Sequence, residues 1–331
     1  MVRETIVETI KKYDLIAPND IVVVAVSGGP DSMCLLDNLV NLKEQFKIKK
    51  IVVAHLNHMI REESKEETEY VKKYCEDKNI ECFIKFVNVI QKAEQEKIGV
   101  EEAGRKERYA FFDEIAKKIN ANKIAIAHNC NDNAETVLMH LLRGSGIAGL
   151  SGIKPYREGK FIRPIIKCKR EEIEKYCNDN NLNPKYDKSN DDNTYTRNKI
   201  RNELIPYIQK EFNPSIIETI DRLSELVLNE ENYMEKVTEK SFKEIVIDEK
   251  NNYIILDLKK FNSLEYVIKA RLILYITKKI FGSANGIEKT HVEDIIKLCG
   301  NNKGNKYLMP NKHYKITVKN KKIYCELQIK N

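Results

Sequence analysis

The sequence predicts an α/β protein: an open parallel sheet with helices on both faces, followed by a mainly helical second domain. Two continuous apolar runs rich in β-branched residues, Ile21–Val26 and Ile51–Leu56, are typical of strands buried on both faces. Helical patterns separate these runs, which favours crossover connections between parallel strands. A length of 331 residues suits two domains. In such a sheet we expect ligands at the carboxyl ends of the strands.

Strands and helices alternate through the first part of the chain. The expected strands are Ile21–Val26, Ile51–Leu56, Cys82–Val89 and Lys123–Ala127, and the expected helices are Ser32–Leu42, Ser64–Lys78, Val100–Ile119 and Asn133–Arg143. Residues 151–200 are rich in loop formers. Further along we expect helices over Lys199–Lys210, Pro214–Phe242, Leu264–Ile280 and near His291–Cys299, a strand over Ile254–Leu258, and a β-hairpin within Tyr314–Ile329. The break at Phe212-Asn213-Pro214 predicts one domain over 1–210 and a second over 211–331.

The composition excludes several classes of protein. No stretch approaches the ~18 apolar residues of a membrane span, and the N-terminus lacks the apolar core of a secretory signal. The eight cysteines include no Cys-x-x-Cys pair. They therefore indicate reduced thiols in a cytoplasmic protein rather than disulfides or a thiolate metal site. The net charge is +7, and residues 301–331 hold eight lysines and one acid, which suits either a polyanion or a solvated surface.

A glycine-rich loop, Ser27-Gly28-Gly29-Pro30-Asp31-Ser32, joins the first expected strand to the first expected helix. Glycines permit positive φ and let the backbone approach an anion closely. The start of a helix adds unpaired N–H groups and a partial positive charge. The loop lacks the terminal Gly-Lys-[Ser/Thr] of a Walker A motif, and Asp31 suggests a metal-bridged pyrophosphate instead of a lysine clamp.

Polar residues follow two other expected strands at the edge where a ligand should bind. His55, Asn57 and His58 end the second strand, and they either contact the ligand or make hydrogen bonds inside the protein. Asp132 and Glu135 follow the fourth strand. They either cap the next helix or hold a metal ion or a cationic substrate.

Arginines supply the candidate contacts for phosphate or RNA. Arg108 lies on an expected helix, and the segment Lys154–Arg170 holds seven basic residues interleaved with aromatic ones. Arg197 and Arg201 lie one turn apart on a later helix. Basic residues mixed with aromatics suit an RNA backbone and unstacked bases, and a solvated basic surface is the alternative.

Six motifs occur in a fixed order between residues 20 and 205. They are SGGxDS at Ser27–Ser32, HxNHxxR at His55–Arg61, EAxxRxxRYxFF at Glu102–Phe112, HxxDDQxET running into LLRGSGxxGL over His128–Leu150, an RPL-type segment at Arg163–Ile165, and DxSN…RNxxR over Asp187–Arg201. In this order they resemble the tRNA(Ile)-lysidine synthetase family of the N-type ATP pyrophosphatases, which carry the PP-loop.

The resemblance implies an ATP-dependent ligation. In that family the C2 oxygen of the wobble cytidine in a CAU-anticodon isoleucine tRNA attacks the α-phosphate of ATP, and pyrophosphate leaves. The ε-amine of free lysine then attacks C2 and AMP leaves. The amine must be neutral, and deprotonating lysine at pH 7 costs roughly 4.6 kcal/mol. Glu135 or Asp132 is the expected base, with His128 as the alternative.

The resemblance also implies roles for individual residues. The expected catalytic residues are Asp31, Arg108, Asp132 and Glu135, and Asp31 is also the expected contact of a Mg²⁺ cofactor. ATP is expected to contact Ser27, Gly28, Gly29, Pro30, Asp31, Ser32, His55 and Asn57. Lysine is expected at Asp132 and Glu135, and the tRNA at Arg163, Arg170, Arg197 and Arg201. The expected partners are this tRNA and L-lysine, with no membrane, and a homodimer is an open alternative to a monomer.

The chain departs from the family pattern in two places and leaves alternatives open. Asn131 replaces the first Asp of HxxDDQ and Asn133 replaces its Gln, which removes any carboxylate role at position 131. Many members continue into a further C-terminal domain, so it stays open whether these residues hold the whole tRNA-binding surface. A PP-loop tRNA 2-thiolation enzyme, an amidotransferase-coupled synthetase such as a GMP synthetase, and a non-catalytic nucleotide- or RNA-binding protein are the alternatives.

Overall fold

The computed structural model describes residues 1–59, 64–185, 196–284, 286–301 and 306–328. These residues form two compact units, Met1–Leu228 and Asn229–Asn331. The division falls inside the long helix α10 (Ile216–Ile245), beyond the expected boundary between 210 and 211. The break predicted at Phe212-Asn213-Pro214 separates α9 (Ile205–Glu211) from α10.

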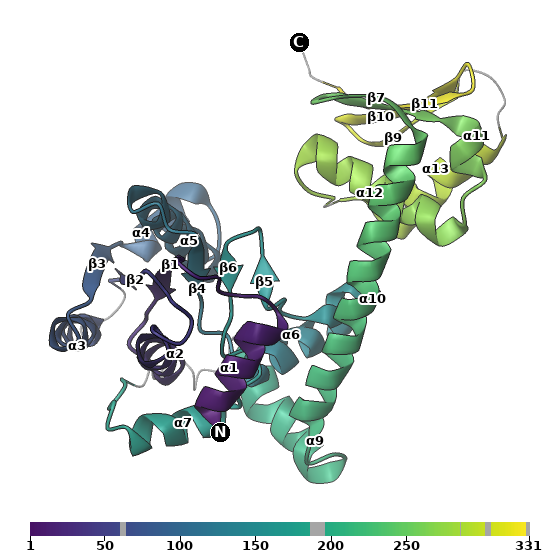
Figure 1. Cartoon of the computed structure of the whole chain (residues 1–331). Helices are drawn as coiled ribbons and strands as arrows, with labels where there is room; N and C mark the ends of the chain where they lie inside the picture. The colour runs from purple at the N-terminus through teal and green to yellow at the C-terminus, as the bar shows by residue number, and fades with distance from the viewer. Residues whose placement is uncertain (60–63, 186–195, 285, 302–305, 329–331) are drawn as a thin grey trace. The chain divides into compact units, whose positions relative to one another are not determined.

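The first unit contains a six-stranded sheet in the order β3-β2-β1-β4-β6-β5 (Figure 1). Its strands are β1 (Ile21–Ala25), β2 (Lys50–Asn57), β3 (Glu81–Phe86), β4 (Lys123–Ala125), β5 (Tyr156–Arg157) and β6 (Phe161–Ile162). All neighbours are parallel except β5 and β6, which are antiparallel. Four of these strands, β1 to β4, lie where the sequence predicts them, because β-branched residues favour strands buried on both faces.

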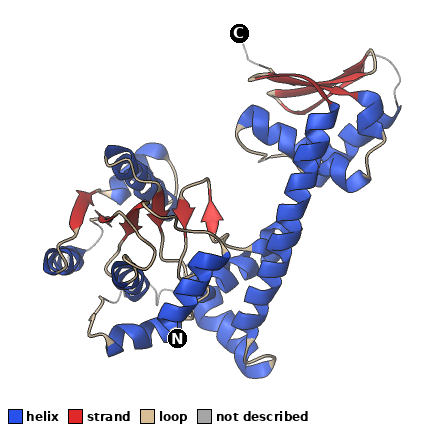
Figure 2. Cartoon of the chain, viewed as in Figure 1, coloured by secondary structure: helices blue, strands red, loops and turns tan. Residues whose placement is uncertain are grey.

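Helices cover both faces of this sheet (Figure 2). Alternate residues of β1 belong to different cores: Val22 and Val24 pack in a cluster with Leu35 of α2, while Val23 packs in another with Phe111 of α5. The open parallel sheet with two helical layers is therefore confirmed. The helices and turns of this unit before α10 are α1 (Val2–Lys12), α2 (Pro30–Asn41), α3 (Ser64–Asp77), α4 (Val89–Glu96), α5 (Val100–Lys118), α6 (Cys130–Leu142), η1 (Ile147–Ser151), α7 (Arg170–Asp179), α8 (Thr196–Lys199), η3 (Ile200–Leu204) and α9.

Some elements differ from the expectation. The structure adds α1, α4 and α7 and the two-residue strands β5 and β6. Helix α6 begins at Cys130, three residues earlier than expected, because Asn129 caps it. Arg61 and the segment Asp187–Asn190, both part of the sequence motifs, lie outside the described residues.

The second unit is rich in helix, as expected, and it also contains more strand than the sequence predicts. Its five-stranded antiparallel sheet has the order β7-β8-β11-β10-β9, so the predicted hairpin of β10 and β11 forms the middle of a larger sheet. Helices pack on one face of this sheet (Figure 2). The elements after α10 are β7 (Val246–Lys250), β8 (Tyr253–Asp257), α11 (Leu258–Asn262), α12 (Tyr266–Phe281), α13 (Lys289–Asn301), β9 (Lys306–Asn311), β10 (Tyr314–Lys319) and β11 (Lys322–Leu327).

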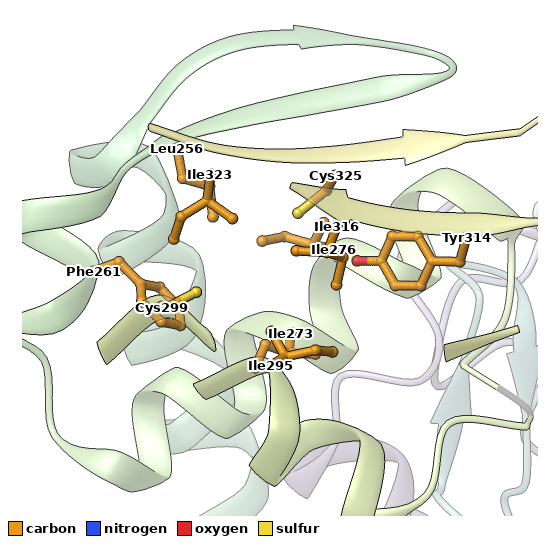
Figure 3. A pocket seen from close by; sticks show the side chains of 10 residues that line it. All are labelled: Leu256, Phe261, Ile273, Ile276, Ile295, Cys299, Tyr314, Ile316, Ile323 and Cys325. Carbon is orange, nitrogen blue, oxygen red and sulfur yellow. The ribbon is translucent and has the colours of Figure 1, made fainter. Parts of the chain in front are cut away.

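A small cavity lies in the apolar core of the second unit. Its volume is about 10 Å³, which is room for about one water molecule. Its lining is aliphatic apart from two thiols, the ring of Phe261 and the phenol of Tyr314 (Figure 3). A cavity of this size and chemistry does not hold a nucleotide. Among the described residues, no helix has both the length and the apolar character needed to cross a lipid bilayer.

Candidate active site

The glycine-rich loop follows β1 directly and leads into α2, whose first residue is Pro30. Of its two glycines, only Gly28 has a positive φ, of +96°, whereas Gly29 has an ordinary φ of −79°. A Cβ at Gly28 would meet its neighbours at 3.5 Å, which is normal contact. Backbone conformation, rather than lack of space, therefore requires glycine at position 28.

The hydroxyl of Ser32 holds the loop from inside. Its Oγ accepts hydrogen bonds from the backbone N–H groups of Ser27 (3.1 Å) and Gly28 (3.2 Å), and donates to the carbonyl of Gly29 (3.0 Å). Ser32 is 4% exposed, whereas Ser27 is exposed. The loop is thus shaped by its own hydrogen bonds, and the first turn of α2 adds N–H groups that have no partner within the helix.

Asp31 connects the loop to the next strand end. Its Oδ1 accepts a hydrogen bond of 2.7 Å from Nδ2 of Asn129. Burial, with the charge of Asp132 as a second cause, raises the pKa of Asp31 to about 6. The carboxylate is therefore mostly ionised at pH 7 in surroundings that disfavour its charge, and a bound cation would stabilise it.

Asn129 and Asp132 form a reciprocal cap at the start of α6. The side chain of Asn129 accepts from the N–H of Asp132 (2.9 Å), and Oδ2 of Asp132 accepts from the N–H of Asn129 (3.0 Å). The capping function expected for Asp132 is present. However, Asp132 pairs with Asn129, one turn before the expected pair of Asp132 and Glu135. Glu135, which the sequence places in the cap, lies one turn further into the helix and is fully buried.

Three arginines surround the two acids. Arg197 bonds through Nε to Oε2 of Glu135 at 2.7 Å and through Nη2 to Oδ1 of Asp132 at 3.1 Å. Arg201 bonds to both oxygens of Glu135, through Nε at 2.6 Å and Nη2 at 3.0 Å. Nη2 of Arg170 lies 3.5 Å from Oε1 of Glu135. These five residues are called the arginine–carboxylate cluster below; its two acids are buried, and its three arginines are partly exposed.

The cluster has three guanidiniums and two carboxylates, so its formal charge is positive by one. Burial lowers the pKa of Arg197 and Arg201, but Asp132 and Glu135 outweigh it and raise the pKa of both arginines. Arg197 and Arg201 therefore stay charged. The cluster can therefore attract an anion, and a cation can enter only by displacing a guanidinium.

His128, at the end of β4, is held in one protonation state. Nε of Arg163 donates to Nδ1 of His128 at 2.9 Å. Desolvation, with the charge of Arg163 next, lowers the pKa of His128 well below its usual value. Its imidazole is thus neutral and carries its hydrogen on Nε2, which makes it a donor. Arg163 is 3% exposed and also bonds to the carbonyl of Lys154 at 2.5 Å, so its guanidinium faces the interior.

The polar residues at the end of β2 bond to the protein itself. Nδ1 of His55 lies 2.9 Å from the carbonyl of Val26, and its Nε2 lies 2.9 Å from the hydroxyl of Thr68. Nδ2 of Asn57 donates to the same hydroxyl at 2.9 Å. His55 and Asn57 are buried, and they join the end of β1 and helix α3 to β2. Of the two functions that the sequence allows for them, this geometry favours internal hydrogen bonding.

The structure brings together most of the expected catalytic residues. Asp31, Asp132 and Glu135 belong to one network that runs through Asn129 and the arginines. Arg108 instead lies on α5, with Nη2 3.2 Å from Nε2 of His58. Sequence reasoning missed Asn129, although an Asn followed three residues later by an Asp, directly after a strand, is a recognisable capping signal.

The thiols near this site are not suited to sulfur chemistry. Burial raises the pKa of Cys130, Cys168 and Cys177 to about 12 and that of Cys34 further. A protonated thiol is a poor nucleophile and a poor metal ligand. Across the part of the chain that the structure describes, no three His, Cys, Asp or Glu residues gather as metal ligands. These features give no support to a thiolation enzyme.

The fold and the loop define a PP-loop protein, and residues 2–208 match the family model of the PP-loop domain. Two curated relatives extend the match. A tRNA(Ile)-lysidine synthase of Clostridioides difficile is 45% identical over 309 residues, covering 93% of this chain and 67% of the relative. One of Clostridium acetobutylicum is 44% identical over 307 residues, covering 92% and 66%. The chain belongs to the tRNA(Ile)-lysidine synthase family, and it spans about two thirds of the length of these relatives.

A solved structure supports the fold alone. The U34-tRNA thiolase NcsA from Methanococcus maripaludis, solved with its [4Fe-4S] cluster, has a TM-score of 0.58 at 20% identity. The match covers 69% of this chain and 78% of that one. At this identity the likeness concerns the arrangement of strands and helices, and it does not extend to the thiolase chemistry.

Proposed function

We propose that this chain ligates lysine to C2 of the wobble cytidine in a CAU-anticodon isoleucine tRNA, consuming ATP and releasing AMP and pyrophosphate. Family membership supports the reaction. One observation carries the proposal to individual residues: Asp31 of the phosphate loop is hydrogen-bonded through Asn129 to the arginine–carboxylate cluster. The proposed pyrophosphate site at Asp31 is thus linked by hydrogen bonds through Asn129 to the proposed amino-acid site at Asp132.

The first step needs the triphosphate held for attack on its α-phosphate. We propose that the loop Ser27–Ser32 cradles the pyrophosphate and that Arg108 contacts the phosphates or the adenylated base. The donor set fits Mg²⁺, because this ion prefers one or two carboxylates completed by phosphate oxygens and water. Asp31 would hold it, and the ion would neutralise phosphate charge. His55 and Asn57 then support the loop from behind instead of touching ATP.

The second step needs lysine beside the activated base. We propose that Asp132 and Glu135 bind its ammonium, as the sequence predicts, after exchange with a guanidinium. The excess positive charge of the cluster favours this exchange, since the arriving phosphates can draw one arginine away. Either of the two arginines that remain suits the carboxylate of the amino acid.

The amine must lose a proton before it attacks. At a reference pKa of ~10.4 this costs roughly 4.6 kcal/mol at pH 7, and a base within reach lowers the cost. His128 does not suit this function, because Arg163 occupies its Nδ1 lone pair and its Nε2 carries a hydrogen. A carboxylate, Asp132 or Glu135, is therefore our proposed base, and His128 is proposed as a hydrogen-bond donor to the reacting groups.

The tRNA contacts expected at four arginines divide into two sets. Arg163 is buried, and we propose that it positions His128 instead of touching RNA. Contact of Arg170, Arg197 and Arg201 with RNA stays a prediction, because their guanidiniums engage the two acids. A cytoplasmic location and a homodimer also stay predictions.

Pyrophosphate release from ATP tests the proposal. We would measure it with and without a CAU-anticodon isoleucine tRNA and with each labelled amino acid in turn. The expected result is release that requires the tRNA, with incorporation of lysine alone. Release that requires RNA without lysine incorporation would keep the adenylation step and reject the nucleophile. Release without RNA dependence would reject the ligation and leave a nucleotide-hydrolysing protein.

A further inference from the structure

Lys167, in the basic segment Lys154–Arg170, is held by two acids. Its Nζ lies 2.9 Å and 2.8 Å from the two carboxylate oxygens of Asp221, and 2.8 Å from Oε2 of Glu225. Both acids lie near the start of α10, within the first unit. The sequence suggests RNA contacts or a solvated surface for this segment. Lys167 does neither, because only 18% of its side chain is exposed and its ammonium contacts two carboxylates.

The charges of this group distinguish it from an incidental surface contact. Burial opposes the charge of Lys167, but hydrogen bonds to Asp221 and Glu225 outweigh it and raise the pKa of the lysine. Burial likewise opposes the charge of Glu225, but hydrogen bonds from Lys12 and Lys167 lower its pKa to about 2. Two acids four positions apart on a helix repel each other, and a cation that contacts both removes this cost. Lys167 and Glu225 therefore stay charged and paired at neutral pH.

The same turn of α10 also holds α6, the helix that carries both acids of the arginine–carboxylate cluster (Figure 1). Nδ2 of Asn133 donates to Oγ of Ser224 at 2.8 Å, and this hydroxyl donates to the carbonyl of Asp221 at 2.9 Å. Asn133 and Ser224 are both buried, and Asn133 directly follows Asp132. One turn of α10, Asp221–Glu225, thus binds both the lysine and α6.

Arg170 makes looser contacts with the cluster than Arg201 does. Nη2 of Arg170 lies 3.7 Å from Oδ1 of Asp132 and 3.5 Å from Oε1 of Glu135. Nε of Arg201, by contrast, bonds to Oε1 of Glu135 at 2.6 Å. At the longer distances the charges attract each other without a hydrogen bond that fixes direction. The place of the Arg170 guanidinium is therefore set mainly by the backbone that carries it.

That backbone is attached to both α6 and α10. The N–H of Arg170 donates to Oδ1 of Asn131 at 3.0 Å, and the N–H of Cys130 donates to the carbonyl of Cys168 at 2.9 Å. These two bonds join residues 167–170 to the first turn of α6. The ion pairs of Lys167 join the same four residues to α10. Because α10 is also bonded to α6, the three segments form one frame around the cluster.

We propose that Lys167, Asp221 and Ser224 are positioning residues that set the distance between Arg170 and the two acids of the lysine site. Arg170 is the arginine whose guanidinium is not hydrogen-bonded to either acid in the described part of the chain, and it binds the α-carboxylate of the incoming lysine. The three positioning residues touch no substrate and act through Arg170 and α6. The inference rests on the proposed function for the identity of the substrate.

Steady-state kinetics of lysine incorporation by the whole chain test the inference. Lys167→Met should raise the KM for lysine by about fivefold or more and change the KM for ATP by less than about twofold, because it moves Arg170 and leaves the phosphate loop in place. Lys167→Arg keeps the positive charge and should restore the original KM for lysine. Ser224→Ala is a smaller change that should act in the same direction, and it replaces Lys167→Met if that variant does not fold.

A double-mutant cycle separates positioning from a general loosening of the fold. In an Arg170→Met background, Lys167→Met should raise the KM for lysine by less than about twofold further, because the residue that it positions is absent. Effects that multiply in the double variant would mean that Lys167 acts by another route, and would overturn the inference. Lys50→Ala is the matched control. It breaks an ion pair with Glu81 at the N-terminal ends of β2 and β3, and it should change neither KM.

Arginine modification gives a readout that does not depend on the reaction. Phenylglyoxal modifies accessible guanidiniums, and peptide mass analysis gives the rate at each arginine. In the substrate-free chain, Lys167→Met should speed modification of Arg170 by about threefold or more, while the exposed Arg143 keeps its rate. An unchanged Arg170 rate in a variant that circular dichroism shows to be folded would reject the positioning. An original chain that incorporates no lysine would reject the proposed function, and the Arg170 rate would still decide whether Lys167 positions this arginine.

Discussion

Nε of Arg163 donates a hydrogen bond to Nδ1 of His128 across 2.9 Å, although 35 positions separate the two residues. Arg163 follows the short strand β6 and His128 follows its neighbour β4, so the parallel sheet brings them together. The bond selects the imidazole tautomer with hydrogen on Nε2. Arg163, which its basic segment suggests as an RNA contact, thus binds the side chain of His128 instead.

Replacing Arg163 by glutamine should free the Nδ1 position of His128. Nitrogen NMR of the labelled ring should then show a mixture of tautomers and a raised pKa, because the adjacent guanidinium is one cause of its lowering. We expect kcat to fall more than the KM of ATP rises. Arg157→Gln is the control, since Arg157 lies nearby but stacks on Tyr109. An unchanged ring spectrum in Arg163→Gln would contradict this assignment.

Gly28→Ala should destabilise the protein by about 1–2 kcal/mol, because a φ of +96° is unfavourable for a residue with a Cβ. Gly29→Ala should change stability by a few tenths of a kcal/mol only, because its φ is ordinary. Urea unfolding measures both effects, and the KM for ATP should rise in Gly28→Ala. Equal losses in the two variants would mean that space, and not conformation, limits this loop.

Glu135→Gln should both weaken folding and impair lysine use. It leaves three guanidiniums around one carboxylate, and breaking a buried ion pair costs roughly 3 kcal/mol or more. Lysine incorporation should fall by at least tenfold at fixed tRNA and ATP. Glu171→Gln on the exposed side of α7 should change neither property. Near-normal incorporation by a folded Glu135→Gln protein would remove Glu135 from the lysine site.

Asp31→Asn should stabilise the substrate-free protein while abolishing pyrophosphate release. The pKa of Asp31 is higher in the folded chain, about 6 against 3.8, so the folded state holds the proton more tightly. The free energy of unfolding therefore falls as the pH rises through this window, by roughly 3 kcal/mol in all. The advantage of Asp31→Asn should be small near pH 4 and nearly complete at pH 7. Urea unfolding at both pH values measures it, with the exposed Asp77→Asn as control.

The central fold was predictable because its strongest signals are local. β1 and β2 are continuous apolar runs, and strands buried on both faces require such runs. Helix α7 was missed because it buries only Ile173 and Cys177 among polar residues, and β5 and β6 are two residues long. The C-terminal hairpin was visible, but its place in a larger sheet depends on β8, a distant segment of the chain.

The loop of the site was predictable for a similar reason, since strand, glycines and helix are consecutive. The arginine–carboxylate cluster was not. The contacts of Arg197 and Arg201 join residues more than 60 positions apart, such as Arg197 and Glu135, and arginine is usually exposed. The sequence analysis names each of these side chains as a candidate site residue. That the arginines pair with the two acids follows only from the fold.

The buried thiols offer a way to follow each unit on its own. Cys34, Cys75, Cys130, Cys168 and Cys177 lie in the first unit, and Cys299 and Cys325 lie in the second. A thiol that is buried and protonated reacts with an alkylating reagent only when its surroundings open. Timed alkylation followed by peptide mass analysis would therefore report how often each unit opens, without any added label. Bound nucleotide should slow the first set of thiols and leave the second set at its own rate.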